Sequence, residues 1–218
     1  ELSSTKQLKE DIGVVFDGIN FYETLTPAKV GKIAGAAYKQ WDGHLFQDYL
    51  KRFQLPLDKE IKSLSKGMKM KLAIAVALSH HAKLLILDEP TAGLDVLTRD
   101  EILDILRDYM EQEDCTILIS SHISSDLESL CDDLYVIDHG QIIMHEEMDT
   151  LLSQYGVLKV SKEDYDNLDK DYLLEVMKEP FGYSCLTNVR QFYSENYPTI
   201  VIEQNHIGEE FFKAINCV

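Results

Sequence analysis

The sequence predicts an α/β fold with a mainly parallel sheet, because short aliphatic strands alternate with helices along much of the chain. The β-branched and aromatic run Ile12–Phe16 indicates a buried strand. Leu84–Leu87 is a continuous aliphatic run, which is typical of a central parallel strand covered on both faces. Thr116–Ser120 is the next strand. The 218 residues, 45% of them hydrophobic and 27% charged, have ordinary globular composition and leave room for one or two domains.

The segment between the first two strands is predicted to be mostly helical. Thr26 is a good helix cap and the proline after it a favoured first helical residue, so we expect a helix over Pro27–Gln40. A second helix is expected over Leu45–Phe53. Together they define a helical unit at Gly18–Leu64, set between strands.

Capping boxes are expected to open the two helices that follow the central strand. The pairs are Thr98 with Glu101 and Ser125 with Glu128. A further strand is predicted at Leu134–Asp138, and His139 with Gly140 is expected to turn the chain into a hairpin strand at Gln141–Met144. Strand and helix therefore alternate through this part of the chain.

The composition changes after about Gly156, where charged and aromatic residues interleave and the strands become short. Helices there, such as Glu209–Ile215, are expected to be brief. We therefore predict a core domain over residues 1–155 and a small α+β accessory domain over residues 156–218.

The overall charge of the chain argues against one class of partner, nucleic acid. A net charge of −17 argues against binding nucleic acid through the overall field, since phosphate backbones attract a positive surface. No apolar run approaches the roughly 20 residues needed to cross a bilayer. The four cysteines form no CxxC pair and no leader-like start is seen, which predicts a cytosolic setting. The segment Ile61–Leu87 is a local exception to the acidic charge, because it contains lysines but no Asp or Glu.

Two acids, Asp88 and Glu89, directly follow the central aliphatic strand. Carboxylates in this position lie at the carboxyl edge of a parallel sheet, where open α/β sheets bind ligands. Asp88 is expected to hold Mg²⁺, and Glu89 to orient and deprotonate a water that attacks a γ-phosphate. The simpler interpretation is that both acids only cap a turn before Pro90.

Three further segments favour the chemical interpretation. A tight loop at Thr91–Asp95 follows the acids, and Ser120–His122 ends the next strand at the same expected edge. Upstream, Leu64–Met68 stands at a helix start among the lysines. Ser65 is expected to cap that helix, Gly67 permits close approach, and the helix dipole favours an anion there. A capped helix with solvated lysines is the simpler alternative for this segment.

In order and spacing these segments resemble the ABC ATPase family. Asp88 and Glu89 are similar to its Walker B acids, Ala92–Asp95 to its D-loop, His122 to its switch histidine, and Leu64–Met68 to its signature sequence. The strand ending at Asp17 is similar to the one that leads into its Q-loop. The resemblance implies a partial P-loop NTPase core with a helical subdomain.

The resemblance also implies roles, cofactors and partners. ATP and Mg²⁺ are the expected cofactors, with Asp88 and Asp17 on the metal and Glu89 and His122 as catalytic residues. Signature residues close over ATP held by a second ABC ATPase subunit, and Asp95 helps to organise that dimer; the signature residues are Ser65, Lys66, Gly67 and Met68. A membrane-spanning permease subunit is expected to contact the helical subdomain, which places the protein at the cytoplasmic face of the membrane.

The chain departs from the family pattern in three places. Lys66 and Met68 replace the usual glycine and glutamine of the signature, as in some bacterial exporter-type ATPases, and Asp17 stands where the Q-loop glutamine is usual. No GxxxxGK[ST] segment, the phosphate-cradling Walker A motif, occurs in the sequence. We therefore expect an N-terminally truncated chain that does not bind ATP alone.

Two alternatives compete with an ATP-hydrolysing transporter subunit. One is a non-hydrolysing ABC-like regulatory or docking module that keeps the signature only to complete a partner's site; the intact acids Asp88 and Glu89 argue against it. The other is a soluble ABC ATPase that acts on ribosomes or DNA, which the acidic charge disfavours.

Overall fold

The computed structural model describes residues 10–18, 21–203, 208 and 211. The chain forms two compact units, residues 1–122 and 123–218, and each is described by itself. The boundary at residue 122 differs from the domain boundary at residue 155 that the sequence suggested. Residues 123–155 group with the C-terminal unit, and the predicted domain assignment stays a prediction.

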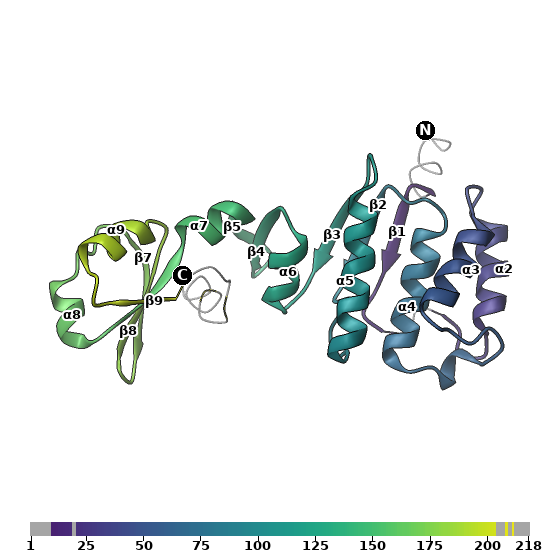
Figure 1. Ribbon diagram of the computed structural model, residues 1–218, viewed down its shortest axis with the longest axis horizontal. Coiled ribbons are helices and arrows are strands. Elements are labelled where there is room, and N and C mark those ends of the chain that lie inside the picture. Colours follow the sequence, from purple (N-terminus) through teal and green to yellow (C-terminus); the bar gives the residue numbers. More distant parts are fainter. Residues whose placement is uncertain (1–9, 19–20, 204–207, 209–210, 212–218) are drawn as a thin grey trace. The chain divides into compact units, whose positions relative to one another are not determined.

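A three-stranded parallel sheet forms the centre of the N-terminal unit (Figure 1). The strands are β1 (Ile12–Val15), β2 (Leu84–Asp88) and β3 (Thr116–Ser120), in the order β1-β2-β3. Both pairings are parallel, in register from Ile12 opposite Leu84 and from Leu84 opposite Thr116. The predicted central parallel strand is confirmed, and all three carboxyl ends meet at one edge of the sheet.

Only one face of this sheet is well covered by the described residues. Leu85 and Leu87 on β2 are buried, whereas the opposite face carries a row formed by Val14, Ile86 and Leu118. Val14 is 42% exposed and Leu118 is 60% exposed. The prediction that β2 is covered on both faces is therefore wrong for the described chain. The reason is that α4 and α5, which an ion pair joins, lie on the same side of the sheet.

The predicted helical unit is present between β1 and β2. It contains α2 (Pro27–Ala37), α3 (Gly43–Arg52) and the short helix η1 (Ile61–Ser63). Thr26 caps α2 as predicted, because its side chain accepts a hydrogen bond from the backbone N–H of Lys29. Helix α2 ends three residues before the predicted Gln40.

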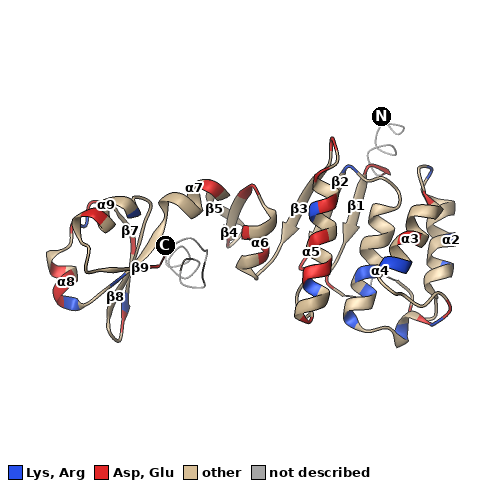
Figure 2. Ribbon diagram, in the orientation of Figure 1, with Lys and Arg blue, Asp and Glu red and all other residues tan. Residues whose placement is uncertain are grey.

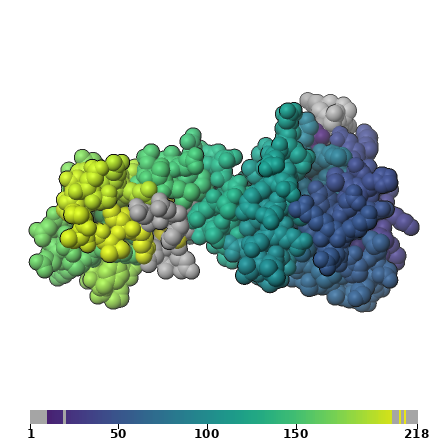
Figure 3. Space-filling view, viewed as in Figure 1, coloured from purple at the N-terminus to yellow at the C-terminus, as the bar shows by residue number. Residues whose placement is uncertain are grey.

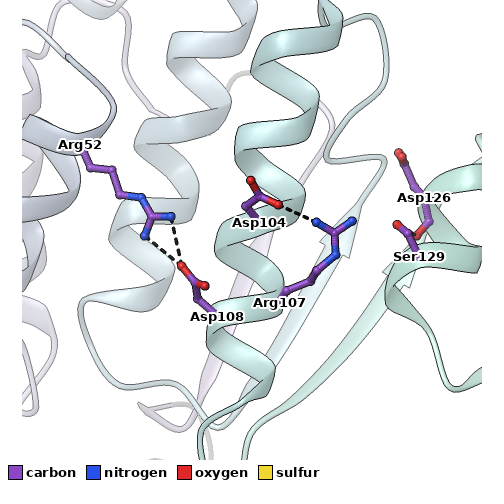
Figure 4. A network of polar contacts seen from close by, with 6 residues as sticks. All are labelled: Arg52, Asp104, Arg107, Asp108, Asp126 and Ser129. Carbon is purple, nitrogen blue, oxygen red and sulfur yellow. Dashed lines mark hydrogen bonds and ion pairs between the residues drawn. The ribbon is translucent and has the colours of Figure 1, made fainter.

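Helices α4 (Lys66–Leu78) and α5 (Val96–Met110) pack beside each other, with Lys71 of α4 paired to Glu101 of α5. Figure 2 shows the acidic stripe of α5 in red. Arg52 of α3 donates two hydrogen bonds of 3.1 Å to Asp108 of α5, and Arg107 pairs with Asp104 one turn away (Figure 4). The Arg52–Asp108 pair ties the helical unit to the helix that follows the acids, and the Arg107–Asp104 pair lies within that helix.

Both predicted capping boxes are wrong. Helix α5 begins at Val96, and its N-cap is Asp95, whose carboxylate accepts from Thr98 N–H. Because the helix is already capped three residues earlier by Asp95, Thr98 lies in its first turn and contributes an orphan N–H, where it was expected to act as the cap. Helix α6 (Ser124–Leu130) has Ile123 at its N-cap, with no side-chain cap hydrogen bond.

The C-terminal unit contains a hairpin and a separate small sheet. Strands β4 (Asp133–Asp138) and β5 (Gln141–Glu147) form the predicted hairpin. His139 and Gly140 both have positive φ, 43° and 77°, which suits a two-residue hairpin turn. Helix α7 (Met148–Gln154) follows.

The remaining elements have the βαββαβ topology of ferredoxin-like folds. They are β6 (Gly156–Val160), α8 (Lys162–Asn167), β7 (Leu173–Glu179), β8 (Gly182–Thr187), α9 (Arg190–Asn196) and β9 (Val201–Glu203). The sheet order is β7-β8-β6-β9, and every pairing is antiparallel. Leu158, Val160, Cys185 and Tyr193 form its buried core. An α+β arrangement is therefore present after Gly156.

Some sequence features fall outside this description. The helix expected at 209–215 lies outside the described residues, apart from Phe211. Cys115, Cys131 and Cys185 are free thiols, and Cys217 is not among the described residues. Across the described chain, none of the helices has the length and apolar character of a membrane span.

Candidate active site

Acidic side chains gather at the carboxyl edge of the parallel sheet. Asp88 ends β2 and Glu89 follows it, while Asp17 lies two residues beyond the end of β1. Ser120 and His122 come from the end of β3, the other neighbour of β2. The parallel topology therefore brings together the acid pair, the serine–histidine segment and Asp17, as the sequence predicted for the first two.

Asp88 is held from β3. The Ser120 hydroxyl donates a 2.8 Å hydrogen bond to Asp88 Oδ1, and the two residues are partners in the strand register. The Asp88 carboxylate is exposed, so one oxygen is oriented by the sheet while the group remains open to a ligand. No sequence signal marked Ser120 as the partner of Asp88, because the contact depends on strand register.

Glu89 has an unusual backbone. Its φ is 48°, in the left-handed region, and its N–H donates to the carbonyl of Ser120 at 3.1 Å. Its carboxylate accepts a 2.7 Å hydrogen bond from His122 Nδ1. The Glu89 side chain is 25% exposed and the imidazole of His122 is 68% exposed. A non-glycine residue held in this region is typical of functional sites, where neighbouring contacts enforce the strain.

The loop after the acids is a series of tight turns. Ala92 N–H donates to the Glu89 carbonyl, and Leu94 N–H to the Thr91 carbonyl. Asp95 ends the loop as the N-cap of α5, with 3.0 Å to Thr98 N and 2.8 Å to Thr98 Oγ1. These bonds, first that from the Thr98 backbone, lower the pKa of the Asp95 carboxyl from its usual value.

The predicted signature segment forms the first turn of α4. Ser65 is its N-cap, as predicted, and accepts a 3.2 Å hydrogen bond from Met68 N–H. A Cβ added to Gly67 would lie 2.8 Å from Thr98 Cγ2, so only glycine fits without movement. The first turn of α4 therefore packs closely against the beginning of α5, where the predicted D-loop ends.

Lys66 contacts Asp17 across the site. Its Nζ lies 3.1 Å from Asp17 Oδ1, and the two side chains are 49% and 45% exposed. A Cβ added to Gly93 would lie 3.7 Å from the same nitrogen. The amine of Lys66 therefore lies beside both the end of β1 and the loop after the acids.

Several lysines of the Ile61–Leu87 segment are paired with carboxylates, so less positive charge is available to an anionic ligand than the number of lysines suggests. Lys62 pairs with Glu60, Lys66 with Asp17 and Lys71 with Glu101. These carboxylates come from outside the segment and compensate much of the positive field that the sequence suggested for the signature helix.

The described acids do not form a complete metal site by themselves. Within the described residues, no group of three or more His, Cys, Asp or Glu side chains is placed to hold a metal ion. Mg²⁺ is commonly bound by one or two carboxylates together with substrate phosphates. The exposed carboxylate of Asp88 suits that mode, in which the nucleotide supplies the remaining ligands.

Comparison with known proteins agrees with this arrangement. Residues 1–92 match the family described as ABC transporter. The chain is similar to ABC transporter ATP-binding proteins. It is 32% identical over 155 residues to the ABC transporter ATP-binding protein NatA of Bacillus subtilis, covering 66% of this chain and 61% of NatA. It covers 51% of the B. subtilis protein YtrB, so the chain spans about half to three fifths of the length of these relatives.

Solved structures share the fold of this chain. An ATP-binding subunit of an ABC transporter superposes with a TM-score of 0.62 at 25% identity, over 69% of this chain and 64% of that one. The ATP-binding cassette MJ0796, solved as a dimer in a post-hydrolysis state with ADP and Pi, gives a TM-score of 0.59. That match, at 22% identity over 68% of this chain and 67% of the other, shows the fold alone.

Proposed function

We propose that this chain supplies the hydrolytic edge, the signature helix and the helical subdomain of an ATPase that powers an ABC transporter. The hydrogen bond between Glu89 and His122 carries the proposal. It joins a carboxylate and an imidazole that follow two neighbouring strands, and Asp88 directly precedes the carboxylate in the chain. Glu89 would accept a proton from the attacking water as general base, and His122 would fix the orientation of that carboxylate and contact the γ-phosphate.

Asp88 is the proposed ligand for the Mg²⁺ that accompanies ATP. When bound, the metal would supply positive charge to neutralise the phosphates. The side chains of this chain orient that chemistry, since Ser120 fixes one oxygen of Asp88 and leaves the carboxylate exposed. The P-loop that cradles the phosphates would come from sequence outside these 218 residues, because no GxxxxGK[ST] segment is present here.

A second ABC ATPase subunit is the first proposed partner. Its nucleotide would meet the signature residues at the first turn of α4, where Ser65 and Gly67 lie next to the end of the D-loop. Val96 and Leu97, which directly follow Asp95, are 70% and 80% exposed and offer apolar surface beside this site. The dimeric state of MJ0796 supports such an arrangement.

A permease subunit at the cytoplasmic face of the membrane is the second proposed partner. Helices α2 and α3, in the blue part of Figure 3, lie at the surface of the N-terminal unit and border a groove of about 550 Å³. Its lining is mainly apolar and includes Trp41, Phe46, Leu50 and Leu57. An apolar segment of the permease would fit here, because such grooves commonly bind amphipathic helices.

The hydrolytic role is tested with Glu89→Gln in a full-length protein that contains a P-loop. ATP turnover should fall about 10²–10⁴-fold, the usual contribution of a general base, and an ATP-bound dimer should accumulate. Phosphate release and size-exclusion chromatography measure both effects. Glu111→Gln, an exposed acid at the end of α5, is the matched control. Equal turnover in Glu89→Gln and wild type would rule out the general base, and no turnover in the wild type would favour a docking module.

The permease groove is tested with Leu57→Glu, which places a charge at the exposed edge of the groove. Co-purification with the membrane subunit should be lost while ATP turnover of the isolated ATPase stays unchanged. Tyr22→Glu, at an 83% exposed aromatic residue that is not among the groove residues, is the control. Full retention of the permease by Leu57→Glu would contradict the assignment of this groove.

A further inference from the structure

The two residues that depart most clearly in charge from the family pattern contact each other. Lys66 stands where the signature usually has glycine, and Asp17 stands where the Q-loop usually has glutamine. In the fold, Lys66 Nζ lies 3.1 Å from Asp17 Oδ1. Each departure adds one charge to the site, and the contact brings those opposite charges together.

Without Lys66, Asp17 would lose the ammonium group that compensates its charge at the sheet edge. Asp88 receives a hydrogen bond from Ser120 and Glu89 one from His122, so each of these acids has a polar partner on β3 or just after it. Asp17 is at the end of β1, on the other side of β2, where β3 cannot reach it. The ammonium of Lys66 provides the compensating charge from the first turn of α4.

The contact between Lys66 and Asp17 is supported by the way in which the first turn of α4 is held in place. Ser65 fixes the first turn through its hydrogen bond to Met68 N–H, and Gly67 is packed against Thr98. The chain path therefore places Lys66 within reach of both Asp17 and Gly93. A carboxylate whose oxygen is already within 3.1 Å of an ammonium group is a poor ligand for a divalent cation, because the two cations repel each other.

We propose that Lys66 is a positioning residue that holds Asp17 as an ion pair and keeps this carboxylate out of the metal-binding set. Asp17 is then the partner of the signature helix, and Asp88 remains the acid that faces Mg²⁺. The pair joins the end of β1 to the first turn of α4 inside one chain. The inference relies on the proposed function only for the identity of the metal as the Mg²⁺ of ATP.

Binding of Mn²⁺, a paramagnetic substitute for Mg²⁺, tests this proposal on the 218-residue chain without nucleotide. Electron paramagnetic resonance measures the free ion during titration. Lys66→Met should bind Mn²⁺ about threefold to tenfold more tightly than wild type, because removal of an exposed ammonium frees Asp17. Asp17→Asn should not tighten binding in the wild-type background, where it leaves the Lys66 ammonium unpaired, and should cancel the gain in the Lys66→Met background. Lys66→Arg should behave as wild type.

Lys69→Met is the matched control, since Lys69 lies on the same helix and forms no ion pair with a described residue. The proposal is wrong if Lys66→Met binds Mn²⁺ no more tightly than Lys69→Met. This includes the case in which neither variant shows detectable binding. It is also wrong if Asp17→Asn weakens binding equally with and without Lys66. Thermal unfolding verifies that each variant is folded, and Lys66→Gln replaces Lys66→Met if the latter is not. Loss of ATPase activity in the full-length protein would overturn the proposed function without changing these readings.

Discussion

His122 Nδ1 lies 2.7 Å from Glu89 Oε2, and this contact joins the residues that follow two adjacent parallel strands. A carboxylate can only accept, so the proton of the bond is on Nδ1 and the other ring nitrogen is left for a ligand. The contact fixes one oxygen of Glu89 and leaves its second oxygen for a water. Orientation of the proposed general base therefore depends on the histidine.

Removal of the imidazole tests that dependence. His122→Ala in the full-length protein should lower kcat about 10²-fold or more with a smaller change in KM, because an interaction made in the transition state is lost. Steady-state phosphate release measures both constants. His139→Ala, a 95% exposed turn histidine, should leave both constants at the wild-type values. A wild-type kcat in His122→Ala would show that Glu89 is oriented by other contacts.

The cap of the signature helix makes a separate contribution to stability. Ser65→Ala should lower the free energy of unfolding of this chain by about 1 kcal/mol, because Met68 N–H loses its acceptor. Urea denaturation followed by circular dichroism measures this change. Ser65→Asp should retain most of the stability since a carboxylate also caps helices. Equal losses for both substitutions would contradict a capping role.

The close packing of Gly67 can be examined with a pair of substitutions. Gly67→Ala should destabilise the chain by about 1–3 kcal/mol, because the new Cβ would lie 2.8 Å from Thr98 Cγ2. Thr98→Ser removes that methyl group, so the double variant should recover part of the loss. Urea denaturation of the four proteins gives the coupling energy. Additive effects would mean that Gly67 is not restricted by Thr98.

The N-cap of α5 makes part of the stability dependent on pH. The folded pKa of Asp95 is below its ordinary value of 3.8, mainly through the hydrogen bond from Thr98 N–H. The folded state therefore binds this proton less readily than the unfolded state, and the stabilisation is complete above pH 3.8. It is lost as pH falls through the folded pKa.

Asp95→Asn keeps a capping oxygen but removes the charge. The stability difference between wild type and Asp95→Asn should be larger at pH 7 than at pH 3, as measured by urea denaturation at both values. Asp114→Asn, the same substitution in the loop before β3, is the control for loss of a carboxylate in general. A constant difference across this range would contradict a lowered pKa at Asp95.

The sheet and its acids were predictable because their signals are local. A continuous aliphatic run predicted β2, and the acids at its end were expected at the carboxyl edge, where the structure places them. Strand β3 has the predicted bounds, Thr116–Ser120. The cap of α5 was misassigned because Asp95 and Thr98 are both good N-cap residues, and local sequence does not choose between them.

The features that were not predicted depend on contacts between segments that are distant in the sequence. The ion pair of Lys66 with Asp17 follows from the position of α4 beside β1, and no spacing rule links the two residues. The exposed row of Val14 and Leu118 reflects which face the helices cover. The order of the four C-terminal strands likewise depends on pairing between short segments, for which the sequence pattern is weak.

The left-handed backbone of Glu89 affects which substitutions can stabilise this protein. A residue with a Cβ at φ 48° costs of order 1 kcal/mol or more relative to glycine, so Glu89→Gly would relieve strain while deleting the carboxylate. Directed evolution that selects only for thermal tolerance would therefore favour loss of the acid at this position. Thermostable versions of the proposed ATPase should be screened for turnover as well as for melting temperature, because the substitution that relieves strain here also removes the proposed base.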